Sequence, residues 1–317
     1  MTSARPDMSL PPEVVHLPFE DEPFRMAMGL VSCPAAYWIE LDDRYPAEMA
    51  ERRALLTGRH GEVFAVCPGS EAARAEALGL LAAHLPHRFP AWFRREGDAL
   101  RNALTGECWN LATPPCDPLE LAGRLVQEDL CLVRPGPDGP VLEAAVLCAP
   151  SRWRLLEKIG RPLLQVHAPV PFYAQRLGAP VDRFMRLLRP GRIALRMNWS
   201  VVDDPALFQP GGKHRTERDA SITAANAGER LSLRTERQTF RSLAGSGAVL
   251  FTIRVHSYPL ARIAAVPGAA ARLSAAVRAL PAEMGAYKSL PVFQEALLAY
   301  LAAKAGDRLS RLCARRP

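Results

Sequence analysis

The sequence predicts an α+β fold in which antiparallel strands lie between two sets of helices. Three strand-like runs stand close together in the second half of the chain, at 192–203, 230–240 and 247–260. Segments in which alanine and leucine recur at helical spacing come before and after them. The order of helices, then strands, then helices is typical of α+β proteins, and it differs from the strand–helix alternation of a doubly wound parallel sheet.

The first half of the chain predicts mainly helices. Residues 1–24 are rich in proline and polar residues and predict an extended lead-in. Helices are expected over Glu40–Arg59 and Glu71–Leu85. Asp117 supplies an N-cap acceptor before Pro118, with a glutamate three residues after the cap, so a third helix should run from there to about residue 127.

Short elements follow in the middle of the chain. Two apolar runs, 129–135 and 140–150, flank Gly-Pro-Asp-Gly and predict a hairpin. Ser151 is expected to cap a helix that stops at Gly160, and another brief helix is expected over Asp182–Leu188. In the run at 247–260, four apolar residues at odd positions from 249 to 255 alternate with a second set that ends in Arg254 and His256, which predicts a strand with two unlike faces.

After Pro259 the chain is expected to be helical through Leu280, and again from Pro291 to about Arg311. No break in composition separates two domains. We therefore expect one α+β domain over 25–317, with a helical C-terminal extension from about residue 265.

Composition narrows the class of protein. The chain has 317 residues, 49% of them hydrophobic, and a formal net charge of +7. Its arginines are scattered and do not alternate with aromatic residues, so nucleic-acid binding is not expected. Seven cysteines without a C-x-x-C pair predict neither a zinc site nor an iron–sulfur cluster. No apolar run reaches the roughly 20 residues of a membrane span, and a cytoplasmic location is expected.

Common catalytic signatures are absent from the sequence. It holds no G-x-x-x-x-G-K-[ST] phosphate loop, no H-E-x-x-H, no G-x-S-x-G, and no G-x-G-x-x-G after a strand. A redox reaction would therefore need electrons from another source.

Four segments carry unusually dense polar and aromatic residues inside apolar text: VHAPVPFY (166–173), RMNWSV (196–201), LRTERQTFRSL (233–243) and LFTIRVHSYPL (250–260). Together with YWIELDDRY (37–45), QEDLCLV (127–133) and the stretch 148–160, they occur in the order found in one family. From about Pro23 to Leu260 the chain resembles the haem-dependent oxidative N-demethylase α-subunit-like family.

This resemblance implies a PAS-like fold that holds haem b, and an oxidation of the N-methyl group of a small alkylamine by O2, with release of formaldehyde. It also implies that electrons come from NADPH through separate FMN- and 2Fe-2S-containing partner polypeptides, one of them a reductase. The basic net charge favours a partner with an acidic face. A second hypothesis is a haem-binding PAS-like sensor or haem-holding protein without turnover, and a third is a degenerate member that holds no haem.

His167 is the candidate axial haem ligand and the candidate metal ligand. It ends an apolar run that we interpret as a strand, and Ala-Pro-Val-Pro follows it, so the backbone around its ring should be stiff. A buried, hydrogen-bonded histidine is the alternative from the residues alone, and the H-x-P-V-P setting of the family favours the ligand. His256 is the rival, and His214 is expected to be solvated. Thiolate ligation by Cys131 or Cys148 is conceivable, but burial suits both better.

Charged residues inside the predicted sheet are the candidate catalytic groups, because such charges are costly unless paired or used. Glu236 is expected to hold a cationic amine, with Arg254 orienting it or binding a haem propionate; the alternative is a cross-strand Arg–Glu pair that stabilises the fold. Asn198 is expected to hydrogen-bond substrate or oxygen, unless it and its neighbours only flank a core tryptophan. The cofactor-binding set comprises Arg196, Arg237 and Trp199 besides His167, and the resemblance alone suggests a lid of Tyr37, Trp38 and Tyr45.

Overall fold

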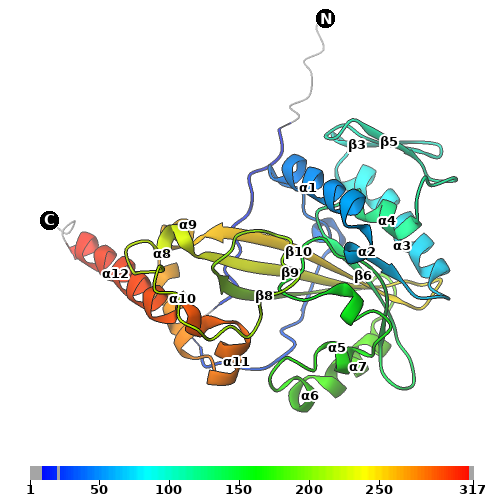
Figure 1. Cartoon of the computed structure of the whole chain (residues 1–317). Helices are drawn as coiled ribbons and strands as arrows, with labels where there is room; N and C mark the ends of the chain where they lie inside the picture. Colours follow the sequence, from blue (N-terminus) through cyan, green and yellow to red (C-terminus); the bar gives the residue numbers. More distant parts are fainter. Residues whose placement is uncertain (1–8, 20–21, 314–317) are drawn as a thin grey trace, which may run out of the picture.

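A seven-stranded antiparallel sheet forms the centre of the protein (Figure 1). The computed structural model describes residues 9–19 and 22–313, with side chains to residue 306. The strand order is β1-β8-β9-β10-β6-β7-β2. The strands are β1 (Val31–Ser32), β2 (Phe64–Val66), β6 (Asp129–Arg134), β7 (Val141–Val146), β8 (Ile193–Val202), β9 (Ser232–Ser242) and β10 (Val249–Pro259).

Helices cover both faces of this sheet and one of its ends (Figure 1). Four helices from the first half of the chain lie over one face: α1 (Tyr45–Gly58), α2 (His60–Val63), α3 (Glu71–Arg88) and α4 (Pro118–Gly123). Three short helices lie below the other face: α5 (Leu163–Val166), α6 (Tyr173–Arg176) and α7 (Gly178–Leu187). The end is covered by α8 (Ala227–Arg230), α9 (Leu260–Ala264), α10 (Ala269–Arg278), α11 (Ala282–Tyr287) and α12 (Gln294–Cys313). Single-turn 3-10 helices are η1 (Ala35–Tyr37), η2 (Leu155–Glu157) and η3 (Leu290–Val292).

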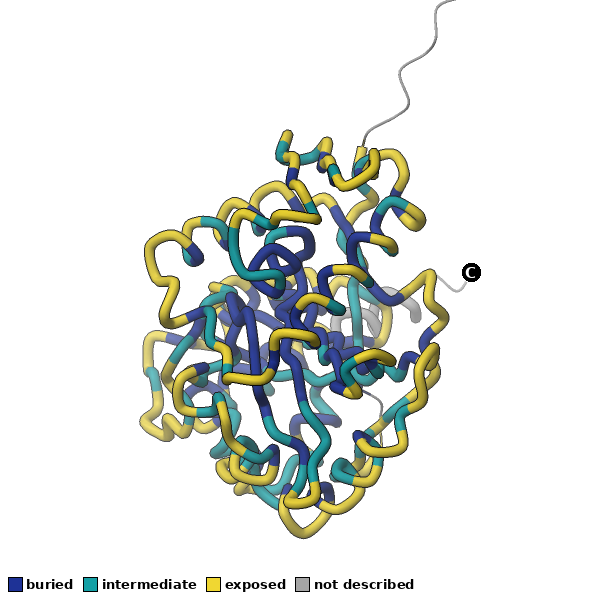
Figure 2. The backbone as a smooth tube through the Cα atoms, turned by 90° about the vertical axis from the view of Figure 1, so that its right-hand side faces the viewer, coloured by how far each residue is buried: buried dark blue, intermediate teal, exposed yellow. Residues whose placement is uncertain are grey.

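Apolar side chains fill three clusters around the sheet, and the central strands are buried along most of their length (Figure 2). Leu250 belongs to the apolar cluster that includes residues of α1, α3 and α4, whereas Val249 and Val255 belong to the cluster on the opposite face. Alternation along β10 is thus confirmed, because successive side chains of a strand point to opposite faces. The third cluster holds the C-terminal helices against the ends of β9 and β10.

Most long elements agree with their sequence signals. The three central strands, the 129–146 hairpin and α3 are confirmed. Asp117 caps α4 as predicted, since its Oδ1 accepts a hydrogen bond of 2.8 Å from the Leu119 backbone N–H. The α+β class is confirmed as well. Residues 9–19 of the predicted lead-in form no regular element, while 1–8 and 20–21 lie outside the described residues.

Three local predictions are wrong. Residues 151–160 form only the single turn η2, and Ser151 instead bridges to Gln209. The run before His167 is helix α5 and not a strand. A small sheet of β3 (Phe93–Glu96), β4 (Ala99–Asn102) and β5 (Glu107–Asn110) has no counterpart among the predicted elements. Its strands are only four residues long and β3 is mostly charged and exposed, so the segment carries no strong period-2 signal.

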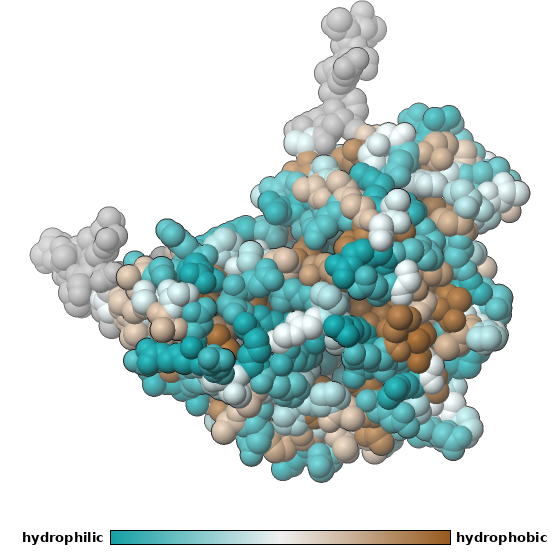
Figure 3. Space-filling model, viewed as in Figure 1, coloured by the Kyte–Doolittle hydropathy of each residue, from teal (hydrophilic) through white to brown (hydrophobic). Residues whose placement is uncertain are grey.

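Hydrophilic side chains cover most of the face shown in Figure 3. Among the described residues, no helix is both long enough and apolar enough to cross a bilayer.

Candidate functional site

A cluster of polar side chains, which we call the Glu236 chamber, surrounds Glu236 of β9 on the α5–α7 face of the sheet. Asn198 of β8 is the register partner of Glu236, so both side chains project from the same face. Three groups donate hydrogen bonds to the carboxylate of Glu236. They are Ser151 Oγ, Asn198 Nδ2 at 3.3 Å and Gln238 Nε2 at 2.8 Å.

These donors keep the half-buried Glu236 ionised. Burial raises the pKa of its carboxyl, but the hydrogen bond from Ser151 and the nearby guanidinium of Arg234 lower it, and the balance lies below the ordinary value. Arg234 itself is buried and donates to Ser151 Oγ at 2.9 Å, which ties the loop before η2 to the strand. The chamber therefore holds a fixed negative charge at neutral pH.

Cations around Glu236 outnumber this single carboxylate. Burial lowers the pKa of both Lys213 and Lys288 to about 8, and their attraction to Glu236 only partly offsets that effect. Arg196 of β8 is also close to Glu236, and its Nε is buried without a hydrogen-bond partner in the described part of the chain. This nitrogen could donate to an additional acceptor, as could the buried Nη1 of Arg52 and Nε of Arg254.

His167 lies at the entrance to the loop between α5 and α6. Its Nδ1 is 2.9 Å from the carbonyl oxygen of Leu163. A carbonyl only accepts, so Nδ1 carries the proton and the lone pair is on Nε2. Burial, helped by the nearby positive charges of Lys158 and Arg196, lowers the pKa of His167 to about 4, so the imidazole is neutral at physiological pH.

A ring stack and a constrained backbone nearby hold this imidazole in place. Its ring stacks on that of Tyr173, with centroids 4.3 Å apart and an interplanar angle of 12°. Phe172, the residue before α6, has a left-handed conformation with φ of 64°, which is rare for a bulky residue and is often found at functional sites. The result is a rigid neutral imidazole with an available nitrogen lone pair, as metal ligation requires.

Two other predicted site residues lie on the opposite face. Arg254 is the register partner of Arg237, whereas Glu236 is paired with Val255, so the sheet separates both arginines from Glu236. Arg254 is fully buried and pairs with Asp42 at 2.8 Å and Glu48 at 2.7 Å.

Arg237 pairs with Glu40 at 3.0 Å and donates to the carbonyl oxygens of Trp38 and Tyr37. The expected contact between Arg254 and Glu236 is therefore replaced by ion pairs that join the sheet to the segment before α1 and to α1 itself. This corrects the orienting role expected for Arg254, and Arg237 is likewise outside the Glu236 chamber.

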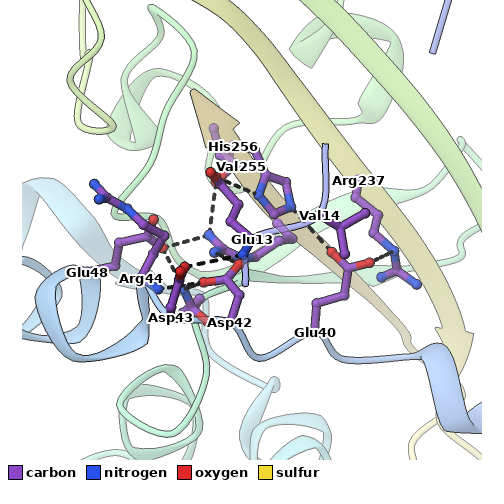
Figure 4. Close-up of polar contacts among 12 residues, drawn as sticks. Glu13, Val14, Glu40, Asp42, Asp43, Arg44, Glu48, Arg237, Val255 and His256 are labelled. Carbon is purple, nitrogen blue, oxygen red and sulfur yellow. Dashed lines mark hydrogen bonds and ion pairs between the residues drawn. The ribbon is translucent and has the colours of Figure 1, made fainter. Parts of the chain in front are cut away.

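Trp199 and the two other candidate histidines, His256 and His214, lie outside the Glu236 chamber or at its border. Trp199 is the neighbour of Asn198 on the other face of β8, where it packs edge-on against Phe19 with centroids 5.6 Å apart. Lys288 Nζ lies 5.2 Å from its ring centroid, at the border of the chamber. His256 is buried between Glu13 and Glu40 and does not enter the chamber (Figure 4). His214 is exposed, as predicted.

The expected lid is not formed by the three aromatic residues. Trp38 and Tyr45 are fully buried in the cluster under α1, and Tyr37 is exposed beside them. The thiols of Cys131 and Cys148 are buried, and burial raises both pKa values, that of Cys148 to about 11. Neutral thiols are poor metal ligands, which agrees with the prediction that these cysteines fill the core.

Sequence reasoning missed Ser151, Lys213, Lys288 and Tyr173. The available signal was weak: Lys213 follows a Gly-Gly pair in a polar loop, and Lys288 stands alone between helical segments. Only the fold brings these residues to the strand pair that holds Asn198 and Glu236.

The protein thus has an α+β fold in which one imidazole, one carboxylate and several cations come together on one face of the central sheet. The sequence model described as "Haem-dependent oxidative N-demethylase, alpha subunit-like" matches residues 29–298. The chain belongs to this family. The match extends past the sequence motifs into α12, so the C-terminal helices are part of the family unit.

Proposed function

We propose that this protein is a haem-dependent monooxygenase that removes a methyl group from a small secondary or tertiary amine and releases formaldehyde. The proposal rests on His167, whose neutral imidazole has a free Nε2. This imidazole lies close to the same cations that surround the ionised Glu236. A metal-ligating histidine characteristically donates its other ring N–H to a carbonyl or carboxylate, as His167 does. Family membership supplies the cofactor and the reaction class.

The chemistry of the donor groups fits haem b. Arg196, Lys213 and Lys288 provide positive charge that Glu236 alone does not balance, and the partnerless Nε of Arg196 could donate to an additional acceptor. Two propionates would supply both the charge and the acceptors. His167 would hold the haem iron through its Nε2, and Arg196 would bind a propionate. When bound, haem would supply the activation of dioxygen that oxidation of a methyl group needs.

Glu236 would bind the substrate amine, because a carboxylate is the natural partner of an alkylammonium. Ser151 and Gln238 fix its two oxygens, so the carboxylate does not need to reorganise when the amine arrives. Asn198, already bonded to Glu236, would orient the amine or oxygen. The apolar side chains of Val255 and Ile253 on the same face exclude water and strengthen the ion pair.

Electrons would come from NADPH through separate FMN- and 2Fe-2S-containing partner subunits. The α-subunit-like description of the family favours such an assembly. We further propose a PAS-like arrangement of the sheet around the cofactor and a cytoplasmic location. The six cysteines whose side chains the structure describes are all free, which is usual in a reducing compartment.

The test of the ligand is an absorption spectrum of the full chain supplemented with haem. We expect a Soret band for the wild type and for His87→Ala, an exposed histidine of α3 that serves as the control. His167→Gly should lose or shift the band, and added imidazole should restore it by entering the vacated space. A colourless wild-type protein, or an unchanged spectrum of His167→Gly, would contradict the proposal.

The test of the reaction is formaldehyde release by the haem-loaded chain with NADPH, a flavin/iron–sulfur reductase and a panel of methylamines. Release that depends on both amine and NADPH is expected, and Glu236→Gln should abolish most of it while the Soret band remains. Haem binding without turnover on any amine would refute the enzyme and favour the non-catalytic haem-holding alternative.

A further inference from the structure

Two histidines and a glutamate from distant parts of the chain meet on the face of the sheet opposite the chamber. His16 comes from the N-terminal segment, Glu40 from the segment before α1, and His256 from β10. Nε2 of His16 lies 3.2 Å from Glu40 Oε2, and Nε2 of His256 lies 3.3 Å from the same oxygen. One ligand atom from each residue can be chosen so that all three lie within 4.8 Å of one another.

The hydrogen-bond chemistry of His256 requires a cation at this point. Its Nδ1 is 3.3 Å from Glu13 Oε1 and its Nε2 is 3.3 Å from Glu40 Oε2, so carboxylate oxygens face both ring nitrogens (Figure 4). A neutral imidazole has one N–H and satisfies only one of them. A second proton or a metal ion between Nε2 and Glu40 satisfies the second oxygen. Two imidazole nitrogens aimed at one carboxylate oxygen also form a nitrogen and oxygen donor set of the kind that binds zinc.

Two of the three separations between candidate ligand atoms match a tetrahedral ion, and the third, between the two imidazoles, is at most 4.8 Å and would shorten on binding. Zinc–nitrogen and zinc–oxygen bonds of about 2.0–2.1 Å place neighbouring ligand atoms about 3.3 Å apart. The two nitrogen–oxygen separations to Glu40 already have this value. The side chain of His256 is completely buried, whereas those of His16 and Glu40 are 20% and 24% exposed, so one side of the site is open to water.

Outer groups orient the candidate ligands as they do in metal sites. Glu13 accepts from His256 Nδ1, which directs the lone pair of Nε2 toward Glu40. Arg237 holds the other oxygen of Glu40 at 3.0 Å. The positive charge of the neighbouring Arg254 is more than balanced, because it pairs with two carboxylates, those of Asp42 and Glu48.

We propose that His16, Glu40 and His256 form a binding site for a divalent transition metal ion, with Zn²⁺ the best match. A water molecule would take the fourth position. The ion would fasten the N-terminal segment to β10, since its ligands are 24 and 216 residues apart in sequence. The site is separate from the Glu236 chamber and does not depend on haem.

The test uses the haem-free full chain, dialysed against chelator and then against Zn²⁺, with bound metal measured by mass spectrometry. We expect one Zn²⁺ per chain, a rise in Tm on its addition, and the ligand-field absorption of a tetrahedral site with Co²⁺. His16→Ala should lose the ion, and Glu13→Gln should weaken it about 10- to 100-fold. The matched control is His60→Ala, which removes a histidine paired with one glutamate, Glu120, at 2.9 Å.

Absence of bound Zn²⁺ in the wild type would overturn the proposal. Equal Zn²⁺ binding by His16→Ala and His60→Ala would also overturn it, because the ion would then sit elsewhere. Neither of these readouts involves haem or amine, so a failed zinc test leaves the demethylase proposal unaffected. Conversely, a colourless protein that binds Zn²⁺ would refute the demethylase proposal and leave the metal site standing.

Discussion

Lys288 provides a quantitative test of the excess positive charge in the chamber. It is half-buried, its Nζ donates to the carbonyl oxygen of Trp199, and burial lowers its pKa from 10.5 to about 8. Keeping this ammonium charged at its buried position costs free energy, and haem propionates would return part of it. We therefore predict that Lys288→Met stabilises the haem-free protein at neutral pH.

The magnitude follows from the two pKa values. In the folded protein the lysine releases its proton near pH 8, and in the unfolded chain near pH 10.5, so the penalty is complete below pH 8 and disappears as the pH rises to 10.5. At about 1.36 kcal/mol per unit the limit is about 3 kcal/mol. Allowing for partial exposure of the side chain and for the lost hydrogen bond, we expect roughly 2 kcal/mol at pH 7.

The assay is urea denaturation of the haem-free protein at pH 7 and at pH 9.5. The stability advantage of Lys288→Met over wild type should shrink by about half between these values, because the wild type loses its buried charge. Lys304→Met, which removes an exposed lysine of α12, is the control and should show no such change. Parallel pH profiles for wild type and Lys288→Met would refute the reasoning.

Three other variants test separate parts of the structure. Glu236→Gln should raise KM for the amine by about 30-fold or more, because removing one partner of a buried charge pair costs about 2 kcal/mol or more. An unchanged KM in steady-state kinetics would show that Glu236 does not bind the amine. Arg254→Met should lower the free energy of unfolding by about 3–5 kcal/mol, because Asp42 and Glu48 lose their shared partner, yet leave the Soret maximum unchanged; a shifted maximum would place it at the cofactor. Gly123→Ala should lower the free energy of unfolding in a denaturant titration by about 1–3 kcal/mol, because the new Cβ would lie 2.7 Å from Val146 Cγ1. Adding Val146→Ala to the same chain should recover most of that loss. Equal stability of the single and double variants would contradict this contact.

The sequence by itself determined the long elements and the family. The period-2 pattern of β10 and the helical spacing of α3 are local signals that tertiary packing reinforces, because each buries the face that the pattern makes apolar. The Asp117 cap is equally local, since donor and acceptor are two residues apart. Ordered polar motifs within the strands carried the family assignment without any knowledge of their contacts.

Tertiary structure alone decided which of the strand charges share a site. Glu236 and Arg237 are adjacent in sequence, yet pleating sends them to opposite faces, and the register with β10 places Arg254 with Arg237. Register depends on which strands pair, and no single strand encodes its partner. The partners of Glu236 also come from loops: Ser151 is 85 residues away, and Lys213 and Lys288 approach from either side of β9 in sequence. His16 and His256 likewise meet at Glu40 only because the N-terminal segment crosses the sheet, a contact over 216 residues that local patterns cannot predict.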